Sequence, residues 1–79
     1  MKYQVEYTDT FGGEANYSWV RRAEFDADEN ATMRTVMVRA RKALSLTGLK
    51  GVVQPIGDGI VFRPYGMCTI MFVSPNYQD

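Results

Sequence analysis

Residues 30–47 read NATMRTVMVRARKALSLT, and this stretch decides the fold. Its apolar and small side chains recur at spacings of three, four and seven residues, which is the period of one face of an α-helix. They are Met33, Val36, Met37, Ala40, Ala43, Leu44 and Thr47. No glycine or proline interrupts the pattern before Gly48. The spacing predicts a helix over Asn30–Thr47 that packs one side against the rest of the chain.

Both ends of this predicted helix carry residues that are typical of helix caps. Asp28, Asn30 and Thr32 are alternative N-caps, because each offers a side-chain oxygen to a free backbone N–H. Gly48 suits the left-handed position just after a helix, which favours glycine. The pattern therefore limits the helix at both ends without choosing among the three N-caps.

The other face of the helix is basic and is the leading candidate for a partner-binding surface. It carries Arg34, Arg39, Arg41 and Lys42. Formal charges sum to −4 over residues 1–29, +5 over residues 30–57 and −1 over residues 58–79. Bases at the end of a helix also complement its dipole, so a merely solvated face is the alternative interpretation.

Length and composition indicate one small domain over residues 1–79, with a frayed polar tail from about residue 74. No apolar run approaches the roughly 18 residues of a membrane span, and the N-terminus has no apolar segment typical of a signal peptide. Cys68 is the single cysteine, which favours a reducing compartment. We expect a cytoplasmic protein.

Two strands are predicted before the helix, antiparallel to each other. Lys2–Thr8 alternates polar and apolar residues, as a half-buried strand does, and residues 16–25 continue with aromatic and β-branched residues. A turn is expected over residues 9–14, where Gly12 and Gly13 lie. Alternation puts Tyr17, Trp19, Arg21, Ala23 and Phe25 on one face of the second strand.

Two aromatic residues here have alternative interpretations. Trp19 is expected to anchor the core under the helix, the alternative being an exposed contact residue. Phe11, in the glycine-rich turn, is expected to fold back as a lid on the core. Its alternative is an exposed contact with a partner.

Three more strands are predicted after the helix, joined by tight turns. They are expected over Gly51–Ile56, Ile60–Arg63 and Met67–Val73. Asp58-Gly59 and Pro64-Tyr65-Gly66 are turn sequences. Both faces of the last strand are apolar, which indicates a central strand, and Cys68 is expected to be a small core residue.

The sum is an α+β fold of order β-β-α-β-β-β, with one helix packed on a mainly antiparallel sheet of about five strands. A single helix cannot cover both faces of such a sheet. Apolar residues expected on the open face are Val20, Val61, Met67 and Met71. If contiguous, they favour a homodimer or a binding surface.

The residues that most catalytic and metal sites need are missing from the sequence. There is no histidine, and Cys68 has no imidazole to pair with. Asp26, Asp28 and Glu29 cluster at the helix start, where capping explains them. We therefore expect no enzyme, no cofactor and no metal site.

Three functions are compatible with these patterns. The first is an inhibitor or adaptor that binds a protein through the basic helix face, Phe11, or the pair Arg63 and Tyr65, since arginine and tyrosine are enriched in interface hot spots. The second is a nucleic-acid-binding module, although a pI near 6.2 is low for that class. The third is an accessory protein that dimerises through the open sheet face.

Two segments look like parts of short bacteriophage and prophage proteins. They are Tyr7-Thr8-Asp9-Thr10-Phe11-Gly12-Gly13-Glu14-Ala15-Asn16-Tyr17-Ser18-Trp19 and Arg63-Pro64-Tyr65-Gly66-Met67-Cys68. The short, single-domain, non-enzymatic character of the chain also resembles the anti-CRISPR proteins that phages encode. This resemblance implies an inhibitor in the bacterial cytoplasm that binds a CRISPR effector complex, and blocks its DNA recognition or its recruitment of a nuclease.

Overall fold

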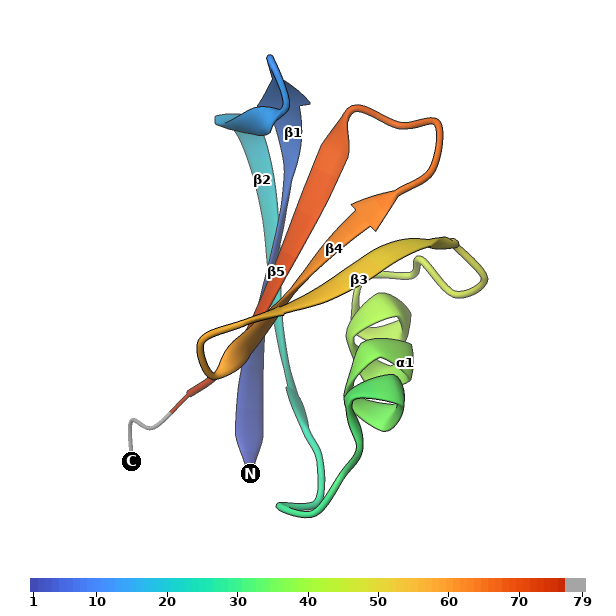
Figure 1. Cartoon of the computed structure of the whole chain (residues 1–79). Coiled ribbons are helices and arrows are strands. Elements are labelled where there is room, and N and C mark those ends of the chain that lie inside the picture. Colours follow the sequence, from blue (N-terminus) through green and yellow to red (C-terminus); the bar gives the residue numbers. More distant parts are fainter. Residues whose placement is uncertain (77–79) are drawn as a thin grey trace.

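The computed structural model describes residues 1–76, which form one helix and five strands in the predicted order β-β-α-β-β-β (Figure 1). The strands make one open antiparallel sheet with the spatial order β2-β1-β5-β4-β3. The elements are β1 (Lys2–Phe11), β2 (Glu14–Asp26), α1 (Met33–Ala43), β3 (Gly51–Ile56), β4 (Gly59–Pro64) and β5 (Thr69–Pro75). The predicted fold class is confirmed, and β5 is the central strand.

The helix is shorter than its sequence pattern predicts. Thr32 is the N-cap, and its hydroxyl accepts a hydrogen bond from the Thr35 N–H. The C-terminal end is closed by Ser45 at φ 59°, with Leu46 N–H donating to the Arg41 carbonyl. This is a Schellman arrangement with serine where glycine is usual. The predicted terminator Gly48 also has positive φ, but it lies in the following turn.

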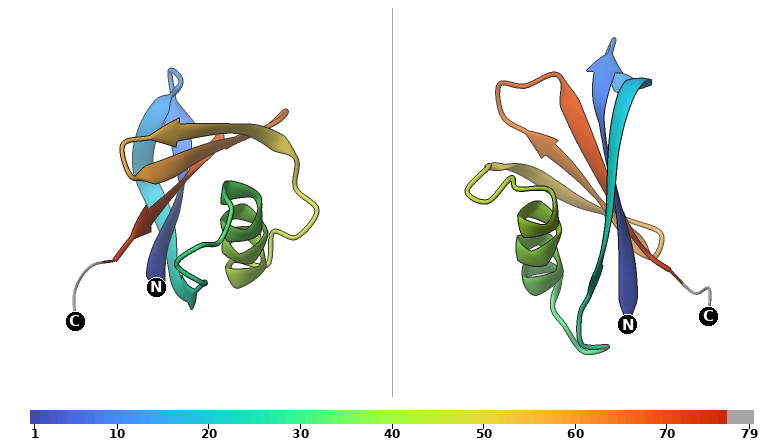
Figure 2. Two further views of the ribbon diagram at one scale, coloured as in Figure 1. Left: turned by 60° about the horizontal axis from the view of Figure 1, so that its bottom comes forward. Right: turned by 180° about the vertical axis from the view of Figure 1, so that it is seen from behind.

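Helix α1 connects the two edge strands, β2 and β3, and lies across the concave face of the twisted sheet (Figure 2). Its stripe buries Val36, Met37 and Ala40. The sheet side of this core comes from all strands except the two edges, and it consists of Val5, Tyr7, Ile60, Phe62, Met71 and Val73. The apolar stripe therefore packs one side of the helix against the sheet, as its spacing predicts.

Two assignments to the open face of the sheet are corrected. Met71 pairs with Tyr7 and Phe62 and is fully buried under the helix, because alternation in β5 puts it on the same face as Val73. Met67 precedes β5 and lies exposed in a loop. Val61 and Val20 do belong to the open face, where Val61 is buried and Val20 is half-buried.

Strand β2 contains an irregularity that changes which way its aromatic residues point. The register with β1 shifts between Thr8 and Thr10, and Tyr17 has φ 56°. The buried Thr8 hydroxyl donates to the Trp19 carbonyl at 2.8 Å and accepts from the Tyr17 N–H at 3.1 Å. Thr8 therefore satisfies backbone groups that the interrupted ladder leaves free.

Two predictions for these aromatic residues are wrong in consequence. Tyr17 bonds with Glu6 on the open face, and this raises the pKa of Tyr17, so it does not share a face with Trp19. Trp19 stays on the helix side, where its ring is edge-on to that of Tyr7 with 5.4 Å between the ring centroids, but 41% of Trp19 is exposed. It lies beyond the part of the sheet that α1 covers, so it does not anchor the core.

The remaining corrections concern the ends of the strands. Phe11 ends β1, so the turn is only Gly12-Gly13, and Phe11 is 80% exposed and forms no lid. Cys68 is exposed in the loop before β5 and is not a core residue. Ser74 and Pro75 belong to β5, and Asn76 N–H donates to the Lys2 carbonyl, so the tail does not begin at residue 74. The rest of the predicted tail lies outside the described residues.

Candidate functional site

An open groove of about 910 Å³ runs between strand β2 and helix α1. The strand side is formed by Glu24, Phe25 and Asp26. The helix side is formed by Arg34, Thr35, Val38, Arg39, Lys42 and Ala43. We call this the β2–α1 groove. It lies where α1 leaves β2 by a six-residue connection, residues 27–32, and runs beside this strand while its buried side chains meet those of the inner strands.

Two hydrogen bonds from arginine side chains tie the walls of this groove together. Arg21 of β2 donates to the Leu44 carbonyl at 2.7 Å, where the free carbonyls at the end of α1 need donors. Arg39 of α1 donates to the Asp26 carbonyl at 3.3 Å. The groove therefore has walls held in place at two points.

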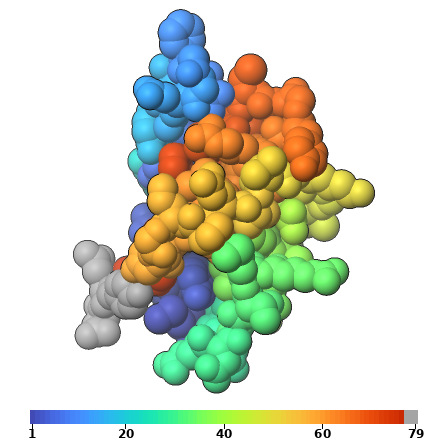
Figure 3. Space-filling model, in the orientation of Figure 1, coloured from blue at the N-terminus to red at the C-terminus, as the bar shows by residue number. Residues whose placement is uncertain are grey.

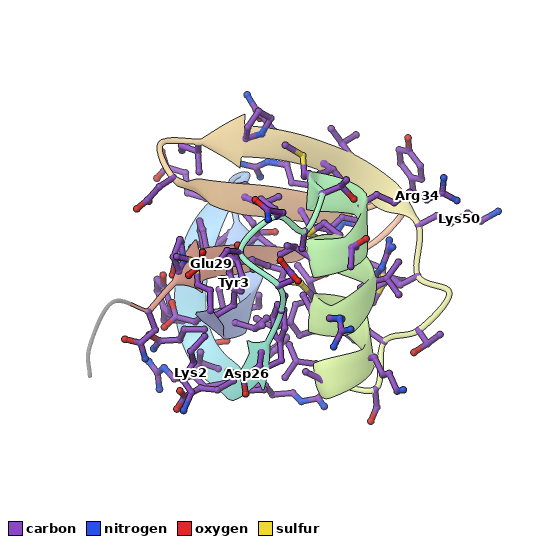
Figure 4. All side chains as sticks on the ribbon, turned by 90° about the horizontal axis from the view of Figure 1, so that it is seen from below. Lys2, Tyr3, Asp26, Glu29, Arg34 and Lys50 are labelled. Carbon is purple, nitrogen blue, oxygen red and sulfur yellow. The ribbon has the colours of Figure 1, made fainter. Side chains whose placement is uncertain are left out.

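Three of the four predicted basic site residues line this groove. The side chains of Arg34 and Lys42 are exposed and form no ion pair or hydrogen bond within residues 1–76, while the Arg39 side chain makes one bond, to the Asp26 carbonyl. Figure 4 shows Arg34 on the side of α1 where Lys50 lies, away from Lys2 and Asp26. The helix wall of the groove thus carries positive charges that form no ion pair within residues 1–76, while Glu24 and Asp26 line the strand wall.

Arg41, the fourth predicted basic residue, is turned to the other side of the helix. Its guanidinium lies over the Phe62 ring at 5.4 Å and donates to the Leu49 carbonyl at 3.1 Å. A smaller hollow of about 280 Å³ opens there, and it is lined by Met33, Arg34, Met37, Arg41 and Val53. Arg34 therefore borders both hollows. Cation–π contact and the bond to Leu49 tie Arg41 to the core and to the loop after α1.

The other predicted site residues gather at one end of the molecule. The tip of the β1–β2 hairpin and the β4–β5 loop project at the same end (Figure 3). Thr10 N–H donates to the Cys68 carbonyl at 2.9 Å, and Arg63 donates to the Gly13 carbonyl at 3.0 Å. Phe11 and Tyr65 are 80% and 67% exposed. Arg63 therefore braces the hairpin tip, while the two aromatic rings are available for contact.

Two ionisable groups in residues 1–76, Asp9 and Tyr17, have shifted pKa values. Hydrogen bonds from Asn16 and Ser18 hold the pKa of Asp9 well below its usual range, and these bonds close the irregularity in β2. No group of three or more Cys, Asp or Glu residues in this part of the chain could hold a metal ion. No helix within it is long and apolar enough to cross a membrane.

Sequence reasoning missed the strand side of the groove. Ala23 and Phe25 were assigned to the same face as Arg21, which is correct, but nothing in the sequence indicated that β2 would be an edge strand.

Comparisons with known protein families, curated proteins and solved structures find no match for this chain. The candidate site therefore rests on its own geometry.

Proposed function

We propose that this protein is a non-enzymatic binding domain that inhibits a host protein complex by occupying its surface. The observation that carries the proposal is the positive helix wall of the β2–α1 groove, where Arg34 and Lys42 have no partner within residues 1–76. An open groove that presents an exposed apolar residue, Val38, beside side-chain charges without ion-pair partners suits recognition of another macromolecule.

More particularly, we propose a phage-encoded anti-CRISPR protein that binds a CRISPR effector and blocks its DNA recognition. This step rests on the resemblance in size and character given above. The exposed pair Phe11 and Tyr65 would add a second contact at the hairpin end. Aromatic side chains commonly contribute most of the affinity in such interfaces.

The test is a pulldown from a phage-permissive bacterium with a CRISPR system, followed by mass identification of the captured protein. We expect an effector subunit, and we expect the tagged chain to restore plaque formation by a targeted phage. Capture of nucleic acid alone, with affinity that falls steeply as salt rises, would instead identify a nucleic-acid-binding module. Failure to restore plaques against every CRISPR type tested would contradict the anti-CRISPR assignment.

Lys42→Glu and Lys50→Glu make a matched pair of variants for this test. Both lysines are exposed and both substitutions change the charge by the same amount, but Lys50 lies outside the residues that line the groove. We expect Lys42→Glu to weaken capture of the partner and Lys50→Glu to leave it unchanged. Equal effects would mean that only overall charge matters.

A further inference from the structure

The sheet has two edges, and they differ in their capacity to accept another strand. Tyr65 N–H donates to the Lys50 carbonyl, in register with the β3–β4 ladder. Because bonded pairs alternate along antiparallel strands, Val52 and Gln54 bond to β4, whereas Gly51, Val53 and Pro55 turn their backbone groups outward. Proline has no N–H, so the β3 edge is interrupted at Pro55.

The β2 edge is continuous over its second half. Met1 and Ala27 exchange two hydrogen bonds, which makes them a bonded pair at the start of the β1–β2 ladder. Alternation then turns the backbone groups of Val20, Arg22 and Glu24 away from β1. Asp26 follows the same alternation, since its carbonyl points away from β1 and accepts a hydrogen bond from Arg39 of the helix.

Nothing in residues 1–76 pairs with these outward groups of Val20, Arg22 and Glu24. The first half of β2 is not a regular edge, because the backbone is irregular at Tyr17. There the backbone N–H groups of Tyr17 and Ser18 donate to the side chains of Thr8 and Asp9. Proteins usually protect a regular edge with proline, a bulge, charged side chains or a covering loop. Residues 20–24 contain no proline or bulge and are protected by the charges of Arg21, Arg22 and Glu24 alone, so this edge admits a strand whose charges complement theirs.

The charges beside this edge determine what could pair with it. On the helix side of β2, Ala23 and Phe25 are uncharged and Arg21 is basic. This side faces a helix wall with Arg34, Arg39 and Lys42. Glu24 and Asp26 alternate with Phe25 and so belong to the open face, where Glu24 is 4.0 Å from Lys2. The side chains of an added strand that point to the helix side would therefore meet bases. Those that point to the open face would meet both acids and bases.

We infer that the β2 edge binds an extended acidic segment of the partner protein as a sixth strand, with carboxylates at alternate positions facing Arg39 and Lys42. This deepens the proposed function and rests on it, since it assigns the kind of segment that the inhibited complex presents. Backbone bonds to Arg22 and Glu24 supply affinity, and the basic helix wall supplies the preference for acids. A second copy of the chain is disfavoured as occupant, because two basic helix walls would face the same junction.

The inference is tested first with peptides, without the natural partner. The probe is a capped peptide of about eight residues in which glutamate alternates with valine and threonine, and its control has lysine in place of glutamate. We expect the glutamate peptide to bind and to slow amide hydrogen exchange at Arg22 and Glu24. Lys42→Glu should weaken this binding by about fivefold, whereas Lys50→Glu should not. Equal binding of both peptides would overturn the inference.

The second arm uses the partner captured from the host. Glu24→Pro removes one outward N–H without breaking a bond to β1, so we expect about tenfold weaker partner binding in a chain whose amide spectrum remains that of a folded protein. Slowed exchange at Arg22 and Glu24 in the wild-type complex gives the same information if that variant does not fold. A captured partner that leaves both amides exchanging freely would keep the proposed function and overturn strand addition.

Two further outcomes separate the proposed function from the inference about the β2 edge. If no partner is captured but the glutamate peptide binds at Arg22 and Glu24, the proposed function fails and the docking site stands. If the amides of Arg22 and Glu24 are already protected in the free protein, and protection rises with its concentration, the edge belongs to a homodimer and the inference is wrong.

Discussion

The two faces of the sheet are both partly apolar, but they are protected from water in different ways. On the concave face, Phe62 and Met71 are buried by the stripe of α1. On the open face, Val61 and Ile70 are buried within the sheet itself, and Arg63 reaches from β4 past β5 to the Gly13 carbonyl. The comparison teaches that one helix suffices for this sheet because twist and long polar side chains cover part of the other face.

The largest expected effect comes from comparing two phenylalanines of neighbouring strands. Phe62 is 0% exposed under the helix, whereas Phe72 is half-buried on the open face. We expect Phe62→Ala to lower the free energy of unfolding by about 3–5 kcal/mol, and Phe72→Ala by about 1–2 kcal/mol, because the second site retains solvent contact. Urea denaturation measures both. Equal losses would mean that the open face is as tightly packed as the core.

The next effect concerns Thr8, the one buried polar side chain that residues 1–76 place on the open face. Thr8→Val keeps the shape but leaves the Trp19 carbonyl and the Tyr17 N–H without their partner. We expect a loss of about 1–3 kcal/mol in the free energy of unfolding. Thr69→Val is the control, because it removes a half-buried hydroxyl that bonds only to the Tyr7 side chain. A smaller loss for Thr8→Val than for Thr69→Val would contradict this role.

A smaller, pH-dependent effect is expected at Asp9. Its pKa in the folded chain is lowered, chiefly by hydrogen bonds from Asn16 and Ser18. Asp9 therefore stabilises the fold above its unfolded pKa of about 4, and this contribution is lost as the pH falls below that value. We expect the urea midpoints of the wild type and Asp9→Asn to differ more at pH 7 than at pH 3. An unchanged difference would exclude the carboxylate as its source.

The smallest effect is expected for the exposed ion pair of the open face. Arg22 and Glu6 are 3.1 Å apart, and both stay in contact with water. A double-mutant cycle with Arg22→Ala and Glu6→Ala should give a coupling of about 0.2–1 kcal/mol, which decreases as salt is added. A larger coupling that is insensitive to salt would show that this pair is part of a less solvated network than its exposure indicates.

Several features of the fold could be predicted because they depend on local spacing. The stripe from Met33 to Leu44 defines a helix and its buried side. A tight β3–β4 turn was also predicted, but its two residues are Gly57 and Asp58, because Gly57 takes the positive φ and Gly59 already begins β4. Thr32 was one of three possible N-caps, and which of them caps the helix depends on the path that the chain takes after β2. The basic residues of α1 were found as candidates, but the separation of Arg41 from the groove depends on Phe62, which lies far away in sequence.

What the sequence by itself determined is the order of elements and the apolar side of the helix, because both follow from the periods of neighbouring residues. The tertiary structure alone decided the strand order, the exposure of Trp19, the placement of Tyr17 on the open face and the groove beside β2. Each of these depends on contacts between residues distant in sequence, such as Thr8 with Trp19 and Arg21 with Leu44. The unpaired edge at Arg22 and Glu24 follows from the same cause, because only the assembled sheet leaves β2 outermost.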